Sequence, residues 1–273
     1  LRRDTHDDDH HIAFDLRREQ PVGMPYDAVV HLAGRRASVA KQHELAADLL
    51  LDNLAIDTNV FRAMRQSGVK RGVYASTVSV YSSLGSDYEK GYREQDACGF
   101  PDHSVRFSAW SKLTAERAIE AMNLQDGAQI SVVRLVNTYG PHDDFGPDAL
   151  VIPSLIRRIS SGESPLRLAG ADNERDVLYV DDAARGIVAA LESPTAGTWN
   201  IGTGKGVTVW DIACEVALAL GVEKMAMESA NALTGAARKV VDPSKAKREL
   251  GWEPRVSLAD GIQRTVAFYR HQM

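Results

Sequence analysis

Four short stretches of the sequence bring together hydroxyl, amine and guanidinium side chains. They are His31-Leu-Ala-Gly34, Tyr74-Ala-Ser-Thr-Val-Ser-Val-Tyr81, Ser111-Lys112 and Arg134-Leu-Val-Asn-Thr-Tyr-Gly-Pro141. A positioned hydroxyl or ammonium group can hold or pass on a proton, and an arginine can donate two parallel hydrogen bonds to a phosphate. These residue types favour acid–base chemistry on a ligand that carries phosphate.

Three other patterns could bind an ion, and each has a simpler interpretation. Asp7-Asp-Asp-His-His11 offers metal ligands, but contiguous ligands near a chain end seldom close a coordination geometry. Gly202-Thr-Gly-Lys-Gly206 lacks the spacing of a phosphate-binding loop and predicts a turn. Asp181 and Asp182 fit the first turn of a helix, where the helix dipole favours negative charge. We therefore predict no metal site.

The elements that must position these groups alternate between short apolar runs and segments with helical spacing, as in β-α units on a parallel sheet. The strands are apolar throughout, as expected when helices cover both faces of a sheet. In the first half we predict strands at 12–15, 27–33, 72–76 and 130–136 and helices at 45–67 and 111–122. In the second half we predict strands at 166–169 and 198–201 and helices at 150–160, 181–191, 209–220 and from residue 258 onward.

The composition is that of an ordinary globular protein of 273 residues, 44% hydrophobic and 25% charged. Because the formal net charge is −5, we predict no nucleic-acid partner. Cys98 and Cys214 are far apart in the sequence, which favours a reducing compartment and a cytoplasmic location. No apolar run approaches the roughly 20 residues that span a bilayer, so we predict no membrane partner.

Three more stretches continue the pattern of the first four to the end of the chain. They are Arg175-Asp-Val-Leu-Tyr-Val-Asp-Asp182, Trp199-Asn-Ile-Gly-Thr-Gly204 and Asp242-Pro-Ser-Lys-Ala-Lys-Arg-Glu-Leu-Gly-Trp-Glu-Pro254. In this order and spacing, the sequence resembles the extended short-chain dehydrogenase/reductase family of sugar-nucleotide epimerases and dehydratases. The resemblance implies an α/β fold with a Rossmann-like, doubly wound parallel sheet and a smaller mixed substrate lobe.

The resemblance also implies a division of labour along the chain. Residues 1–140 would form the dinucleotide-binding domain and 141–273 the substrate-binding lobe, with some chain crossing back to the first domain. The implied cofactor is NAD or NADP, and the implied substrate is a nucleotide sugar that the enzyme would isomerise or dehydrate. Relatives of this kind are commonly homodimers, here through the helices at 45–67 and 111–122.

The family's functional positions fall on particular residues of this sequence. Thr77, Ser108 and Lys112 take catalytic positions; Asp15, Ala33, Gly34, Asn53 and Lys112 take cofactor-binding positions; Asn137, Arg175 and Arg238 take substrate-binding positions at the nucleotide diphosphate. Simpler interpretations stay open, because small residues often end strands and asparagine often caps helices or turns. Arg175 could equally pair with a neighbouring aspartate, and Arg238 could be a surface charge on a helix.

One catalytic position departs from the family pattern. The family's tyrosine stands four residues before its lysine, and in this sequence that position holds Ser108. A serine hydroxyl is far less acidic than a phenol, so base catalysis would lose much of its usual contribution of roughly 100- to 10,000-fold. Tyr88, Tyr92, His103 or Lys112 itself could supply the missing group.

A second departure concerns the cofactor. A dinucleotide-binding domain receives the pyrophosphate at a glycine-rich turn between its first strand and helix. The first glycine of this chain is Gly23, so we expect that turn to be missing, together with the central first strand and roughly 35 residues in all. Three functions follow: an NAD(P)-dependent epimerase or dehydratase, a non-redox isomerase, lyase or cyclase on the same fold, and a catalytically silent binding subunit.

Overall fold

A computed structural model describes residues 15–21, 26–37, 41–81, 91–97, 107–146, 149–230 and 237–270. Its main sheet is parallel, with strands in the order β1-β2-β3-β8. These strands are β1 (Ala28–His31), β2 (Arg71–Thr77), β3 (Gln129–Leu135) and β8 (Thr198–Ile201). The last strand comes from the second half of the chain, which therefore crosses back into the first sheet.

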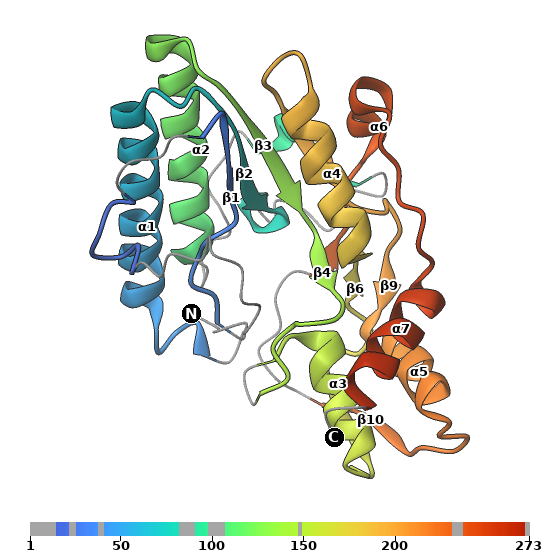
Figure 1. Cartoon of the computed structure of the whole chain (residues 1–273). Coiled ribbons are helices and arrows are strands. Elements are labelled where there is room, and N and C mark those ends of the chain that lie inside the picture. Colours follow the sequence, from blue (N-terminus) through green and yellow to red (C-terminus); the bar gives the residue numbers. More distant parts are fainter. Residues whose placement is uncertain are drawn as a thin grey trace.

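Helices cover both faces of this sheet (Figure 1). Helices α1 (Ala46–Ser67) and α2 (Phe107–Asp126) pack on one face, and α4 (Val180–Glu192) packs on the other. Side chains alternate between the faces along each strand. Tyr74 and Val132 accordingly join the core beneath α1 and α2, whereas Val73 and Val133 join the core beneath α4. The apolar runs in the sequence reflect this burial on two sides.

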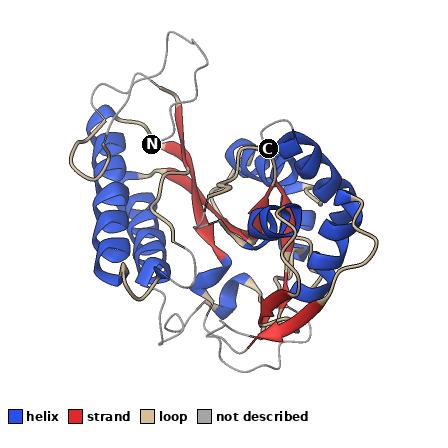
Figure 2. Cartoon of the chain, turned by 90° about the horizontal axis from the view of Figure 1, so that it is seen from below, coloured by secondary structure: helices blue, strands red, loops and turns tan. Residues whose placement is uncertain are grey.

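The second lobe is built from short strands and helices (Figure 2). Strand β4 (Asn137–Tyr139) pairs with β7 (Val177–Tyr179), β5 (Leu166–Ala169) with β10 (Met227–Ala230), and β6 (Glu174–Arg175) with both β9 (Val207–Thr208) and β11 (Arg238–Lys239). Its helices are α3 (Val151–Ser160), α5 (Val209–Leu220) and α7 (Leu258–Arg270), whereas α6 (Ser244–Leu250) packs against β8 of the main sheet. Apolar faces of α3, α5 and α7 enclose a core of their own around Leu166 and Leu168.

Most predicted elements are confirmed within a few residues, including the α/β class and the parallel sheet. Helix α2 is longer at both ends than the predicted 111–122. The two-residue strands β6, β9 and β11 and the short helix α6 were not predicted. Residues 12–14 of the strand expected at 12–15 lie outside the described residues, and Asp15 begins a turn in which its carbonyl accepts the N–H groups of Arg18 and Glu19.

In the part of the chain that the structure describes, no helix combines the length and the apolar character needed to span a membrane.

Candidate functional site

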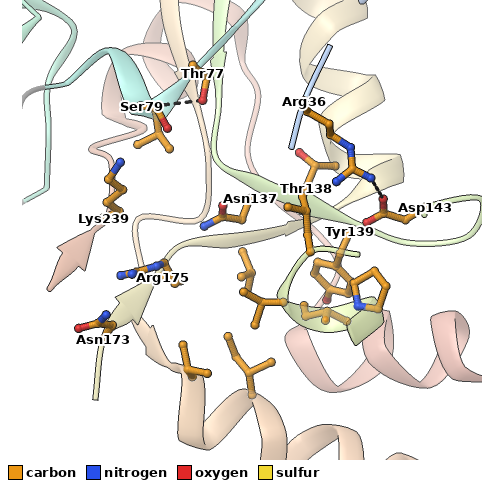
Figure 3. Close-up of a pocket in the computed structure, with 18 of the residues that line it drawn as sticks. Arg36, Thr77, Ser79, Asn137, Thr138, Tyr139, Asp143, Asn173, Arg175 and Lys239 are labelled. Carbon is orange, nitrogen blue, oxygen red and sulfur yellow. Dashed lines mark hydrogen bonds and ion pairs between the residues drawn. The ribbon is translucent and has the colours of Figure 1, made fainter. Parts of the chain in front are cut away.

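A pocket of about 410 Å³ lies between the two lobes, where strands of the main sheet end (Figure 3). The first lobe contributes Thr77, which ends β2, and Ser108, which lies in the first turn of α2. The second lobe contributes Asn137 from β4 and Arg175 from β6. Ligands of doubly wound folds bind at the carboxyl ends of the parallel strands, so the pocket has the position that the fold predicts.

Thr77 is held in place by the backbone that follows it. It precedes a 3₁₀ turn at Val78–Val80, and its Oγ1 accepts a hydrogen bond from the backbone N–H of Ser79 at 3.2 Å. Ser79 also lines the pocket, beside Thr77. The structure therefore brings together three hydroxyl groups on the first-lobe side of the pocket, of which Thr77 and Ser108 were predicted and Ser79 was not.

Gly34, Asn53 and Lys112 form a second cluster just beyond β1. A β-carbon on Gly34 would lie 3.4 Å from Asn53 Oδ1 and 3.6 Å from Lys112 Nζ. The backbone of Gly34 is exposed, so a ligand can approach it closely. Three positions that the sequence assigned to cofactor binding are thus brought together, with Ala33 half-buried next to them.

Asn53 fixes the loop that follows Gly34. Its Oδ1 accepts the N–H of Arg35 at 2.6 Å, and its Nδ2 donates to the carbonyl oxygens of Arg35 at 3.0 Å and Leu49 at 2.7 Å. The alternative that Asn53 merely caps a helix or turn does not apply, because it lies within α1 and bonds to a different loop. Its side chain holds the loop in one conformation beside the exposed glycine.

Lys112 of α2 is half-buried, and its ammonium lies against β2. Its Nζ donates to the carbonyl oxygen of Ala75 at 2.9 Å and lies 4.3 Å from the centroid of the Tyr74 ring. Burial lowers the pKa of Lys112, against the opposing effects of the nearby carboxylates Asp57 and Glu116. The ammonium is therefore held at one place beside Gly34.

Asp15 lies apart from the pocket. Its carboxylate accepts two hydrogen bonds from the Arg17 guanidinium, both at 2.8 Å. This hydrogen-bonded pairing with Arg17 lowers the pKa of Asp15 to about 2. Arg17 also approaches Asp52 of α1 at 3.8 Å. Asp15 is therefore close to the first half of α1.

Arg175 and Lys239 form the cationic wall of the pocket. The parallel register of β6 and β11 pairs Lys239 with Arg175, and Arg238 with Glu174. Residues directly opposite in neighbouring strands share a face of the sheet, and successive residues alternate between faces. Arg175 and Lys239 accordingly line the pocket together.

Arg238 does not join them. It lies in β11, its Nε is 2.7 Å from Glu174 Oε2, and it is not among the residues that line the pocket. Arg238 is part of a strand, so the alternative of a helix charge is wrong. Its buried neighbour Lys239 lines the pocket, and the register of two very short strands separates these two side chains.

Tyr92, one of the groups suggested to act in place of a tyrosine at position 108, does not line the pocket. Tyr92 stacks on Tyr81 within the core, with ring centroids 5.0 Å apart, and neither lines the pocket. Tyr139 does line it, but its hydroxyl points to the carbonyl oxygen of Leu258 at 3.4 Å, and burial raises its pKa. A phenol with a raised pKa is rarely ionised near neutral pH, so it is seldom available to accept a proton.

Tyr88 and His103, the other suggested replacements, lie outside the described residues. So do the ligands of the metal hypothesis at Asp7-Asp-Asp-His-His11. Gly202 to Gly206 forms a loop, as predicted. Asp181 and Asp182 lie in the first turn of α4, also as predicted.

An ion pair that the sequence did not predict joins the lobes at the pocket. Arg36 Nη2, just after Gly34, lies 2.8 Å from Asp143 Oδ1 in the loop that follows β4. This loop is fixed from behind, because Tyr269 of α7 donates to the Asp143 carbonyl at 2.5 Å. The sequence could have indicated Arg36 as a residue near the pocket, because it follows Gly34 by two positions. It could not have indicated Asp143, because the position of that residue depends on the packing of α7.

Known proteins resemble this chain over most of its length. The model of the NAD dependent epimerase/dehydratase family matches residues 5–202. The putative GDP-L-fucose synthase 2 of Oryza sativa subsp. japonica is 32% identical over 255 residues, which cover 89% of this chain and 72% of the relative. The UDP-glucuronate 4-epimerase of Thermodesulfobacterium geofontis is 32% identical over 242 residues, covering 88% of this chain and 71% of the relative.

Solved structures agree with these matches. The UDP-glucose 4-epimerase of Thermus thermophilus in complex with NAD has a TM-score of 0.78 and 29% sequence identity, covering 90% of this chain and 78% of that one. The UDP-glucose 4-epimerase of Thermotoga maritima with UDP-glucose has a TM-score of 0.77 and 27% identity, with the same coverage of both chains.

The fold and the site define the class of protein first. A parallel sheet covered by helices, with an exposed glycine and a pocket at its strand ends, is a Rossmann-type architecture that binds NAD(P). Within that class, the chain belongs to the NAD dependent epimerase/dehydratase family, and it is an enzyme of the epimerase/dehydratase type.

Proposed function

We propose that the pocket binds a nucleotide-activated sugar, with its diphosphate at Arg175 and Lys239 and its sugar at Thr77 and Ser108. The observation that carries this proposal is the pair of cations in register on one wall of a pocket whose other wall carries hydroxyl groups. Guanidinium and ammonium groups bind phosphate strongly through charge-assisted hydrogen bonds. Asn137, between the two walls, can donate its amide to the same phosphates.

The remaining lining of the pocket supports a nucleotide rather than a free sugar phosphate. Beyond the cationic wall the lining is apolar, with Ile152, Val177, Val209 and Ile212. An apolar surface beside a cationic one suits the flat face of a base attached to a charged diphosphate. The end of the pocket that the first lobe forms carries hydroxyl groups, which can hydrogen-bond to a sugar.

The cofactor cluster fits NAD(P) in the same proposal. Gly34 leaves its backbone open, Asn53 fixes the adjoining loop, and Lys112 holds a positive charge beside it. When bound, NAD(P) supplies the hydride acceptor and donor for oxidation and reduction of a sugar hydroxyl. The chain's own part is to hold that hydroxyl at Thr77 and Ser108. Asp15 would bind the adenosine ribose of NAD, while Arg17 and Arg18 beside it offer charge to the additional phosphate of NADP.

A second candidate rests on Ser108. A site that contains serine where the family has tyrosine lacks the acidic phenol that oxidation of a hydroxyl uses. A non-redox isomerase, lyase or cyclase that binds the same nucleotide sugar would need no such group. The catalytically silent binding subunit remains the third hypothesis.

The experiment incubates the full-length protein with NAD⁺ or NADP⁺ and with UDP-, GDP- and dTDP-sugars, and follows the sugars by chromatography and NMR. We expect at least one sugar to be epimerised or dehydrated only when a dinucleotide is bound. Turnover that persists after the dinucleotide has been removed would favour the second candidate. Binding without turnover would favour the silent subunit, and absence of nucleotide-sugar binding would reject the proposal.

Three finer proposals accompany this function. We propose the division into 1–140 and 141–273, a cytoplasmic location, and a homodimer through α1 and α2. Leu51 of α1 and Leu124 of α2 are exposed at 63% and 90%, which supports a contact between copies there. Light scattering that gives the mass of one chain at micromolar concentration would reject the dimer.

A further inference from the structure

Asp57 is a buried carboxylate with no role in the chemistry described above. It lies on α1, is 3% exposed, and bonds to His31 Nε2 and to the Tyr74 hydroxyl, each at 2.9 Å. The Tyr74 hydroxyl donates to Asp57 Oδ2, whereas the donor in the bond between Asp57 Oδ1 and His31 Nε2 depends on the tautomer of the imidazole. Burying a charge is costly unless something compensates it. The buried Asp57 carboxylate therefore calls for a nearby group that compensates the cost of its burial.

Tyr74 connects Asp57 to Lys112. Its ring is completely buried, its hydroxyl donates to Asp57, and its face lies against the Lys112 ammonium, with Nζ 4.3 Å from the ring centroid. A phenol that donates to a carboxylate becomes richer in electrons, and an electron-rich ring attracts a cation more strongly. Asp57, Tyr74 and Lys112 thus form a stack from a negative to a positive charge.

The other acidic neighbour of Lys112 already has a cationic partner. Glu116 lies one helical turn after Lys112, and the Arg134 guanidinium bonds to both of its carboxylate oxygens, at 2.6 and 3.1 Å. The guanidinium of Arg35, in the loop beside Gly34, is likewise held by Asp52 at 2.7 Å. Of these acidic groups, Asp57 is the one bonded to an imidazole and a phenol rather than to a guanidinium.

We propose that Asp57 is a positioning residue that keeps the Lys112 ammonium charged and fixed beside Gly34, acting through the Tyr74 ring. The inference rests on the proposed function in one respect, namely that Lys112 acts at the bound dinucleotide. The electrostatic effects on the pKa of Lys112 agree with this proposal. Burial lowers that pKa, and of the two carboxylates that raise it, Asp57 has the larger effect. Without Asp57, the lowering of the Lys112 pKa by burial would be opposed less strongly, so the ammonium would lose its proton more readily.

The test measures the protonation of Lys112 directly. The folded protein is labelled briefly with acetic anhydride across a pH series, and acetylation of Lys112 is quantified by mass spectrometry. We compare the wild type with Asp57→Asn and Tyr74→Phe, and with Asp126→Asn as a matched control. Asp126 pairs with Arg65 at 2.6 Å, outside the groups named above, so its loss removes the same charge elsewhere. Circular dichroism checks folding.

We expect the labelling midpoint of Lys112 to fall by about one pH unit in Asp57→Asn. It should fall by less in Tyr74→Phe, and it should not move in the control. An unchanged midpoint in Tyr74→Phe and in folded Asp57→Asn overturns the inference. If Asp57→Asn does not fold, the labelling midpoint of Lys112 in Tyr74→Phe alone decides whether the inference holds. The affinity for NAD⁺ and NADP⁺ is measured on the same samples. A shifted midpoint without dinucleotide binding in the wild type would reject the proposed function and leave the role of Asp57 standing.

Discussion

Lys239 lies directly opposite Arg175 in the parallel register of β11 and β6, so that two basic side chains share one wall of the pocket. One residue earlier in each strand, Arg238 and Glu174 form an ion pair on the other face. The charge of Arg238 is thereby balanced within the sheet. The side chains of Arg175 and Lys239 line the pocket.

Lys239 and Arg238 are therefore expected to differ sharply when each is replaced by methionine. Lys239→Met should weaken binding of UDP, GDP or dTDP by about 10- to 100-fold, since a hydrogen bond to a charged group contributes about 1.5–3 kcal/mol. Arg238→Met removes the same charge from the opposite face and should change affinity by less than about threefold. Isothermal titration calorimetry provides the comparison. Equal losses in the two variants would contradict the assignment of the wall.

Ser108→Tyr should raise the rate of turnover by at least about tenfold near neutral pH. The new phenol would lie one helical turn before Lys112, whose ammonium favours the ionised phenol. Ser108→Phe is the matched control, because it adds the ring without the hydroxyl group. Steady-state kinetics on the sugar that the wild type converts checks this. No gain over Ser108→Phe would show that the serine is not simply a lost base.

Gly34→Ala should weaken dinucleotide binding by about tenfold while leaving stability nearly unchanged. The added β-carbon would lie at 3.4 Å from Asn53 Oδ1 and 3.6 Å from Lys112 Nζ, which are ordinary contacts. It would nevertheless fill the space that a ligand needs. Gly68→Ala is a control with the reverse pattern of effects. Because φ is +70° at Gly68, this change should cost about 1 kcal/mol of stability and leave dinucleotide binding unchanged. Fluorescence titration and thermal unfolding separate the two effects.

Asp182 should make stability depend on acid pH. Burial raises its pKa, but the backbone N–H groups of Val256 and Arg255 and the Arg185 guanidinium outweigh burial, so its pKa lies below the ordinary value of 3.8. Its stabilisation is therefore complete above the unfolded-state pKa and is lost as the pH falls through the lower, folded-state pKa. Asp182→Asn should lose about 1–3 kcal/mol near neutral pH and show less pH dependence below about pH 4.

The neighbouring Asp181, which is exposed in the same helical turn, supplies the control for that prediction. Asp181→Asn should lose only the contribution of one exposed charge near a helix N-terminus, about 0.3–1 kcal/mol, and should keep the wild-type loss of stability in acid. Thermal unfolding of the three proteins between about pH 6 and about pH 2 provides the measurement. A wild-type profile that matches Asp182→Asn would contradict the assignment.

The sequence predicted the main sheet well because its strands are buried on both faces. Val73 and Tyr74, neighbours in β2, enter different cores, so both must be apolar or aromatic and the strand reads as one continuous apolar run. The two-residue strands carry no such signal. Strand β11 is recognisable only by its pairing with β6, so no sequence pattern indicated that Lys239 lines the pocket.

The cofactor cluster was predictable and its buried support was not. Gly34, Asn53 and Lys112 stand in stretches that carry the family pattern, and the fold brings them within contact distance. Asp57 lies in the middle of a helix, where a charged residue is usually exposed. Its burial follows from the position of Tyr74 on the neighbouring strand, which no pattern within the helix can indicate.

The central claim is that a sugar hydroxyl is oxidised by NAD(P) in this pocket, with serine in the position of the family's tyrosine. A nucleotide sugar with deuterium on its ring carbons tests it most directly, in a single turnover of the full-length protein with an equimolar amount of dinucleotide. We predict that mass spectrometry will find deuterium on the dinucleotide during the reaction. A converted sugar with no deuterium on the dinucleotide at any time would contradict the claim.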